Sequence, residues 1–147
     1  MRTRLTLSLS DARAMVAAAE AYAIENDLRV SIAVVDESTY LQCAIRMDGA
    51  GCMSMEGAIE KARSAAEGGH PTKWFEDSLK GGNLAILKIP GITPVEGGIP
   101  AFAEGECCGA IGVSGALPHL DSAVAEAGLA ALQASVTVSG TVRGEAQ

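Results

Sequence analysis

Two stretches of the sequence contain residue types suited to binding a carboxylate or another small anion. Arg46 and Asp48 end an alternating apolar–polar segment, and an arginine there can hold a carboxylate through two parallel hydrogen bonds. Ser114 and Gly115 lie just before Pro118, a residue type favoured in the first turn of a helix. The backbone N–H groups of such a strand-to-helix turn can also bind an anion. We therefore expect Arg46, Asp48, Ser114 and Gly115 to contact a ligand.

The candidates for proton transfer are Lys61, His70, Glu96 and His119. Imidazole titrates near neutral pH, so each histidine could be a proton donor, a haem ligand or an ordinary surface residue. Lys61 lies beside the apolar stripe of an expected helix, and a partly buried lysine is either paired with an acid or functional. Glu96 is the best candidate for that acid. It precedes a flexible turn made by Gly97 and Gly98, which we also expect to contact a ligand.

These residues also have purely structural interpretations. Arg46 can pair with Asp48 or Glu96 without any ligand. The glycines at 109, 112 and 115 lie within an expected strand, where glycine usually marks the close approach of another backbone or of a ligand. Their spacing differs from the G-x-G-x-x-G of dinucleotide-binding turns. With only two histidines and no suitable Cys/His spacing, the sequence predicts no structural zinc site.

Hydrophobic spacing predicts the elements that hold these residues in place. Helices are expected at 9–26 with Ser8 and Asp11 as a capping box, at 54–67, at 72–80 with Thr72 as the cap, and from Pro118 onward. Strands are expected at 30–35 and 41–47, joined as a hairpin, and at 98–103 and 107–115. This order favours a mixed α/β (α+β) fold with an antiparallel sheet over a doubly wound sheet. We expect one domain over residues 1–135 and a polar tail over residues 136–147.

Composition narrows the possible partners and the location. The 147 residues suffice for one domain with a real core, and the net charge is −7 with no basic cluster, which argues against nucleic acid or an anionic membrane surface as a partner. No segment approaches the roughly 18 apolar residues of a membrane span. The four cysteines show no framework spacing and the N-terminal segment does not resemble a signal peptide, so we expect reduced thiols and a cytoplasmic location.

Several stretches together resemble one known family. They are SIAVVD (31–36), RMDGA (46–50), an AxxKA pattern (58–62) and GAIGVSG (109–115), and the likeness extends over about residues 5–134. By these motifs the chain resembles the haem-degrading domain family, which includes GlcG-like and HbpS-like proteins and the C-terminal domain of PduO-type proteins. The resemblance implies about five antiparallel strands flanked by helices, as in profilin-like folds, and a homo-oligomer. It implies no catalytic motif common to all members.

Three functional hypotheses follow from the residues and the resemblance. The first is a cytoplasmic homo-oligomer that binds haem or a small organic acid in a pocket. The second is a small catabolic isomerase, lyase or hydrolase, acting on a carboxylated or aromatic-derived substrate through Arg, Glu and His residues. The third is a non-catalytic assembly partner. The segment Pro118–Asp121 and the pair Cys107–Cys108 depart from the usual pattern of the family, which favours a ligand particular to this chain.

Overall fold

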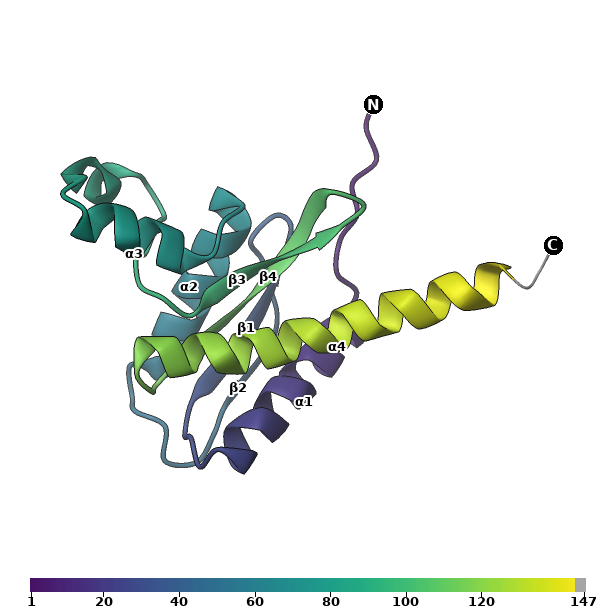
Figure 1. The fold of residues 1–147 in the computed structure, drawn as a ribbon, viewed down its shortest axis with the longest axis horizontal. Helices are drawn as coiled ribbons and strands as arrows, with labels where there is room; N and C mark the ends of the chain where they lie inside the picture. The colour runs from purple at the N-terminus through teal and green to yellow at the C-terminus, as the bar shows by residue number, and fades with distance from the viewer. Residues whose placement is uncertain (145–147) are drawn as a thin grey trace.

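The chain folds into a four-stranded antiparallel sheet with helices on both faces (Figure 1). The computed structural model describes residues 1–144, and side chains through residue 134. The elements are α1 (Leu9–Glu25), β1 (Ser31–Asp36), β2 (Leu41–Arg46), α2 (Ser54–Gly68), α3 (Thr72–Lys80), the 3-10 helix η1 (Leu84–Lys88), β3 (Gly98–Ala103), β4 (Glu106–Ser114) and α4 (Pro118–Gly144). The expected α+β class is confirmed, although the described residues form four strands and not about five. The sequence periodicity itself predicts these four, and the fifth came only from the resemblance.

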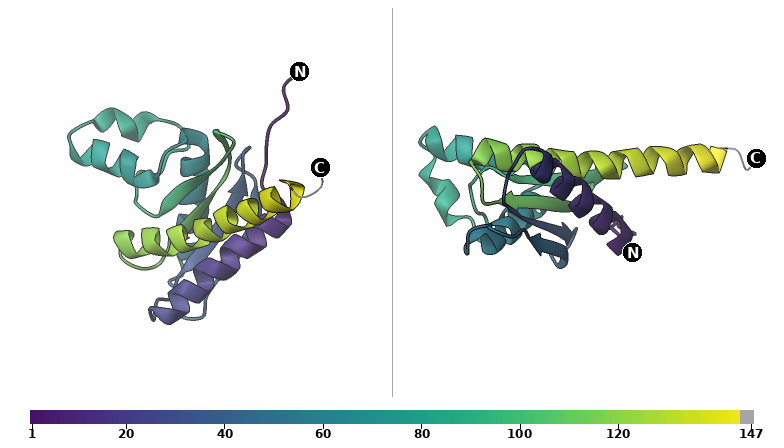
Figure 2. Two further views of the ribbon diagram at one scale, coloured as in Figure 1. Left: turned by 45° about the vertical axis from the view of Figure 1, so that its right-hand side comes forward. Right: turned by 90° about the horizontal axis from the view of Figure 1, so that it is seen from below.

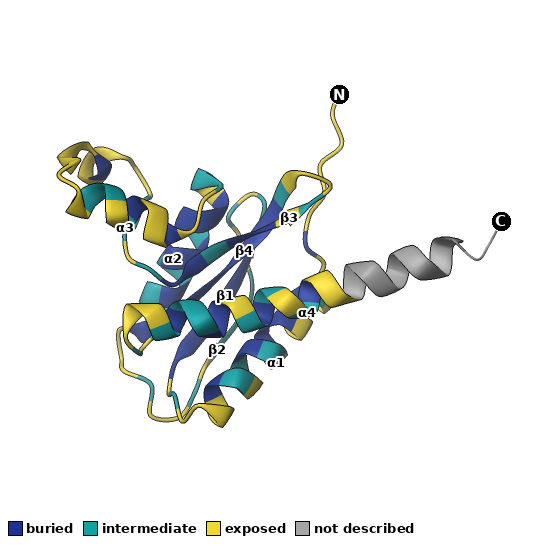
Figure 3. Ribbon diagram, in the orientation of Figure 1, coloured by how far each residue is buried: buried dark blue, intermediate teal, exposed yellow. Residues whose placement is uncertain are grey.

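The sheet order is β2-β1-β4-β3. The first and last strands in the sequence, β1 and β4, therefore lie side by side at the centre of the sheet. Alternate residues of these strands point to opposite faces. Ile32 and Val34 of β1 and Ile111 and Val113 of β4 join the main apolar cluster with α1 and α4. Figure 2 shows α1 and α4 side by side on this face and α2 on the other. Figure 3 shows the burial concentrated in the central strands.

Helix α2 lies directly on the backbone of β3 and β4, because two glycines remove side chains from the contact. Gly98 and Gly112 are cross-strand partners. A Cβ atom on Gly112 would collide with the carbonyl oxygen of Ala58 and with the amide nitrogen of Ala62, and one on Gly98 would collide with the carbonyl group of Lys61. The expected close approach of a backbone is therefore met by α2 at Gly112, and by the backbone of Val35 at Gly109 and of Arg29 at Gly115.

The predicted N-cap is present at the start of α1 but not at the start of α3. Ser8 and Asp11 form the expected capping box, and α1 ends at Glu25 with Asn26 as its C-cap, close to the predicted end. Thr72, in contrast, does not cap α3, because Pro71 occupies the N-cap position. The Thr72 hydroxyl instead accepts a hydrogen bond from the Gly98 N–H at 2.9 Å, which attaches α3 to the start of β3.

The C-terminal segment continues the last helix. The backbone of α4 runs through the expected domain boundary at residue 135 as far as Gly144, and residues 145–147 of the expected tail lie outside the described part of the chain. Among the described residues, no helix is both long enough and apolar enough to cross a membrane.

Candidate ligand-binding site

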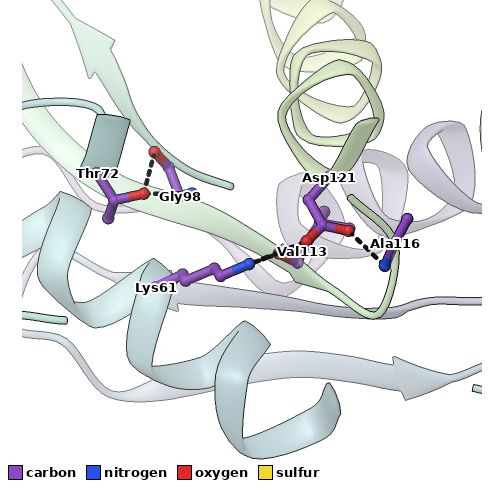
Figure 4. Close-up of polar contacts among 6 residues, drawn as sticks. All are labelled: Lys61, Thr72, Gly98, Val113, Ala116 and Asp121. Atoms are coloured by element: carbon purple, nitrogen blue, oxygen red, sulfur yellow. Dashed lines mark hydrogen bonds and ion pairs between the residues drawn. The ribbon is translucent and has the colours of Figure 1, made fainter. Parts of the chain in front are cut away.

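A buried ion pair joins α2 to the first turn of α4. The Lys61 Nζ atom donates to Asp121 Oδ2 at 3.0 Å and to the carbonyl oxygen of Val113 at 3.0 Å (Figure 4). The two charged side chains are only 5% and 2% exposed, in that order. Buried charges are expensive unless they are paired and hydrogen-bonded, and both conditions hold here.

Neighbouring backbone positions both side chains. Gly97, with φ of +131°, leaves the space that the Lys61 side chain occupies, since a Cβ atom there would lie 2.9 Å from Nζ and 2.6 Å from the Val113 oxygen. Asp121 accepts a second hydrogen bond at its Oδ1 atom from the Ala116 N–H, at 2.9 Å. A carboxylate in the first turn of a helix is also favoured by the helix dipole.

Several effects act on the pKa of Asp121 in opposite directions. Burial away from water is the largest effect, and it raises the pKa of the Asp121 carboxyl above its ordinary value. The Lys61 ammonium and the Ala116 N–H act against that shift, and the charge of Glu96 adds to it. Asp121 is therefore a carboxylate that accepts a proton more readily than a carboxylate in water.

The ion pair lies at one side of a cavity of about 740 Å³, which we call the Lys61 cavity. Its walls are the loop and first two turns of α2 (from Gly51 to Lys61), the segment around Thr93 and Val95, and the turn from β4 into α4 (Ser114–Asp121). Met53, Val95, Ala116 and Pro118 supply apolar surface, and Thr93 and Ser114 supply hydroxyl groups. Volume and composition match those of small-molecule sites.

The charges around the Lys61 cavity are mostly negative. Lys61 is the single basic residue among the described residues that line it, and its charge is already matched by Asp121. Glu56 and Glu60 also line the cavity, and Glu60 has an ion pair with Arg63 at 3.2 Å. A free anion entering the cavity would therefore meet no unpaired cation among these lining residues.

The structure brings three of the sequence-predicted residues to this cavity: Lys61, Ser114 and Gly115. It does not bring Arg46 with them. Arg46 and Ser114 are both register partners of Ser31, from opposite sides, so they lie two strand spacings, or about 10 Å, apart. The hydroxyl of Ser31, which lies between them in the sheet, is hydrogen-bonded at 2.7 Å to that of Ser54. Asp48 follows Arg46 and lines a smaller hollow with Arg29.

Glu96 is not the residue that pairs with Lys61. The ion-pair partner of Lys61 is Asp121, and the prediction of Glu96 was wrong. Asp121 takes this position because the Ala116 N–H anchors its second oxygen. Gly97 gives room to Lys61, and Gly98 is buried under α2, so both act through packing in the described structure.

The two histidines lie in different places, and neither is among the residues that line the Lys61 cavity. His70 is exposed and stacks on Trp74, with ring centroids 4.3 Å apart. It faces a separate hollow that includes Phe75 and Ile89. His119 is exposed in the first turn of α4.

Asp121 is the residue that sequence reasoning missed as a functional candidate. A signal for it existed: an acid three residues after a helix-starting proline has a backbone N–H donor nearby, and Lys61 required a buried acid. The rim residues Cys52 and Met53 gave no signal, because they belong to the cavity only through the packing of α2 against the β4–α4 turn.

Comparison with known proteins places this chain in a family. A family model described as "Haem degrading protein HbpS-like" matches residues 7–130, and the chain belongs to that family. The protein GlcG of Escherichia coli K12 is 39% identical over 114 residues, covering 78% of this chain and 85% of GlcG. The expected family membership is confirmed.

Solved structures of related proteins share the fold over most of its length. The Klebsiella pneumoniae protein ORFY is 28% identical with a TM-score of 0.87, covering 91% of this chain and 95% of ORFY. A double mutant of HbpS from Streptomyces reticuli is 34% identical with a TM-score of 0.83, covering 88% and 89%. PduOC, solved as a haem complex, is 25% identical with a TM-score of 0.79, covering 86% and 95%.

Proposed function

We propose that this protein binds a small, mostly apolar ligand in the Lys61 cavity. The observation that carries the proposal is that the buried Lys61–Asp121 pair lines a largely apolar cavity of about 740 Å³. A fold without a ligand has little reason to keep two buried charges beside a cavity, because well-packed apolar residues stabilise a core as well or better. Polar groups at one point of an apolar pocket orient a ligand.

Haem is the first ligand to test, because PduOC was solved as a haem complex and the family is described as haem-degrading. The apolar part of the lining suits the macrocycle, and Cys52 and Met53 are exposed sulfur donors among the lining residues; the two propionates of haem would have to face solvent, because the described lining offers them no unpaired cation. Thiolate and thioether sulfur are both established types of axial haem ligand. Bound haem would supply redox or oxygen chemistry at the iron, and Cys52 or Met53 would hold that iron.

A haemin titration tests this ligand. We expect a shifted Soret band that saturates at one haemin per chain, and loss of the shift in a Cys52→Ala, Met53→Ala variant. The matched control is His70→Ala, His119→Ala, in which the two histidines away from the cavity are changed; it should titrate like the unmodified protein. Absence of any Soret shift in the unmodified protein would rule out haem as the ligand. Loss of the shift only in the histidine variant would show that haem binds at a histidine and not in the Lys61 cavity.

A small organic acid is the second ligand candidate, and it is less favoured by the geometry. Its carboxylate would compete with Asp121 for Lys61, because the cavity offers no other basic residue among its described lining residues. Acid–base catalysis by Arg46, Glu96 and the histidines is likewise less favoured than binding, since these side chains do not converge on one cavity. Calorimetric titration with mono- and dicarboxylic acids would detect such binding directly.

Assembly as a homo-oligomer belongs to the same proposal. Large exposed apolar side chains support it, among them Met53 at 85%, Leu84 at 69% and Leu87 at 61%. The four free cysteines, Cys43, Cys52, Cys107 and Cys108, support a reducing, cytoplasmic location. Light scattering after size-exclusion chromatography would give the oligomer mass. A monomer at micromolar concentration would contradict assembly as a homo-oligomer.

A further inference from the structure

The Lys61 amine differs from every other lysine of the chain. Lys73, Lys80 and Lys88 are exposed, whereas Lys61 is 4% exposed and is one of the residues that line the Lys61 cavity. An ammonium group has three N–H donors. The acceptors of Lys61 Nζ given by the described residues, Val113 O and Asp121 Oδ2, use two of them. The third donor position remains for a molecule in the cavity.

The pair also contains a proton acceptor in direct contact with the amine. Transfer of one proton from Lys61 Nζ to Asp121 Oδ2, which lie 3.0 Å apart, exchanges two buried charges for two neutral groups. A lysine freed of its proton in this way is a nucleophile, and carbonyl carbon is the usual electrophile for it. Asp121 stays in place during the transfer because its other oxygen is held by the Ala116 N–H at 2.9 Å.

We propose that Lys61 forms an imine with a small, uncharged, largely apolar aldehyde or ketone in the Lys61 cavity, and that Asp121 carries the proton. This inference rests on the proposed function in one respect, that the Lys61 cavity is the ligand site, and it does not require haem. The uncharged class follows from the lining: Glu56 and Glu60 add negative charge, the single basic residue among the described lining residues is already paired, and apolar side chains supply much of the remaining surface.

The reaction balances with the groups present. The Lys61 ammonium gives a proton to Asp121, and the neutral amine attacks the carbonyl carbon to form a C–N bond. The remaining amine proton moves to the carbonyl oxygen, giving a carbinolamine. Asp121 then returns its proton to the hydroxyl, which leaves as water. The product is a protonated imine, and it keeps the positive charge opposite the Asp121 carboxylate. No oxidant or reductant takes part.

The test traps the imine with butanal and cyanoborohydride at pH 7, followed by peptide mapping for butylated lysine. Lys73, Lys80 and Lys88 are exposed to water, whereas Lys61 is buried beside the cavity that would concentrate an apolar aldehyde, so we expect Lys61 to be labelled at least about tenfold faster than these three lysines. This internal comparison needs no variant. Labelling of Lys61 no faster than the exposed lysines would overturn the proposal.

Two variants separate proton carriage from packing. Lys61→Arg keeps the charge but forms no stable imine, so labelling at residue 61 should disappear while the exposed lysines react as before. Asp121→Asn keeps the amine and most of the shape, and the trapping rate at Lys61 should fall at pH 7 and recover at alkaline pH. An unchanged pH profile would overturn the role of Asp121.

Haemin titration of the same preparation distinguishes the two proposals. Haemin binding with unlabelled Lys61 would overturn imine formation and leave the binding function intact. Rapid labelling of Lys61 without haemin binding would support imine formation and remove haem as the ligand.

Discussion

Lys61 and Asp121 lie 3.0 Å apart, Nζ to Oδ2, although 60 positions separate them in the chain. The contact joins the helix that covers one face of the sheet to the turn that begins the helix on the other face. Because both side chains are almost fully buried, each depends on the other for the compensation of its charge.

Removing one partner of this pair should destabilise the protein strongly. Lys61→Met leaves Asp121 buried without its cation, and we expect the free energy of unfolding to fall by about 3–5 kcal/mol in urea denaturation. Adding Asp121→Leu removes the second charge and should restore a large part of that loss. Lys73→Met, which breaks the exposed Lys73–Asp77 pair, is the matched control and should change stability little. Additive losses in the double variant would contradict coupling between Lys61 and Asp121.

The raised pKa of Asp121 predicts a pH dependence of stability with a definite sign. Between the unfolded pKa, about 3.9, and the higher folded pKa, the native state holds a proton that the unfolded state has lost. The contribution of Asp121 is therefore most favourable at low pH and declines as pH rises through this window. The difference in unfolding free energy between the unmodified protein and Asp121→Asn, measured by urea denaturation from pH 3 to 7, should fall with pH. A difference that rises with pH would show a lowered pKa instead.

Gly112→Ala should disrupt the packing of α2 on the sheet. The added methyl group would meet the backbone of Ala58 and Ala62, which cannot rotate away as a side chain can. Overpacking of this kind costs about 1–3 kcal/mol or more, measurable as a lower urea midpoint. Gly51→Ala is the control, since a Cβ atom there meets nothing within 4 Å. Equal stability of the two variants would mean that α2 is not seated on β4 at Gly112.

The cysteines should react with a thiol reagent at very different rates. Cys52 is exposed at the rim of the Lys61 cavity and should react first. Cys108 is buried, and burial together with the adjacent Cys107 raises the pKa of its thiol, so little reactive thiolate forms. Time-resolved labelling with mass spectrometry gives the order, and protection of Cys52 by haemin would support the proposed site. Early labelling of Cys108 in folded protein would contradict its burial.

The sequence allowed the local elements to be predicted because their signals are local. The Ser8–Asp11 capping box, the β1–β2 hairpin and the strand that ends at Ser114 each depend on residues within a few positions of one another. Family membership also followed from contiguous motifs and is confirmed.

The arrangement of the site was harder to predict because it depends on the sheet order. Arg46 and Ser114 both end strands, and only the order β2-β1-β4-β3 shows that β1 separates them. The choice of Asp121 over Glu96 as the partner of Lys61 depends on the Ala116 N–H group, and although Pro118 marks the start of the helix, only the fold brings that helix start to Lys61.

The two-glycine contact between α2 and the sheet has a consequence for ligand size. With its backbone seated directly on β3 and β4 at Gly98 and Gly112, α2 has no intervening side chains that could rearrange to let it slide. That wall of the cavity has a fixed position. Any adjustment to a larger or smaller ligand must then come from the other walls of the cavity. These are the turn from β4 into α4 and the segment around Thr93 and Val95.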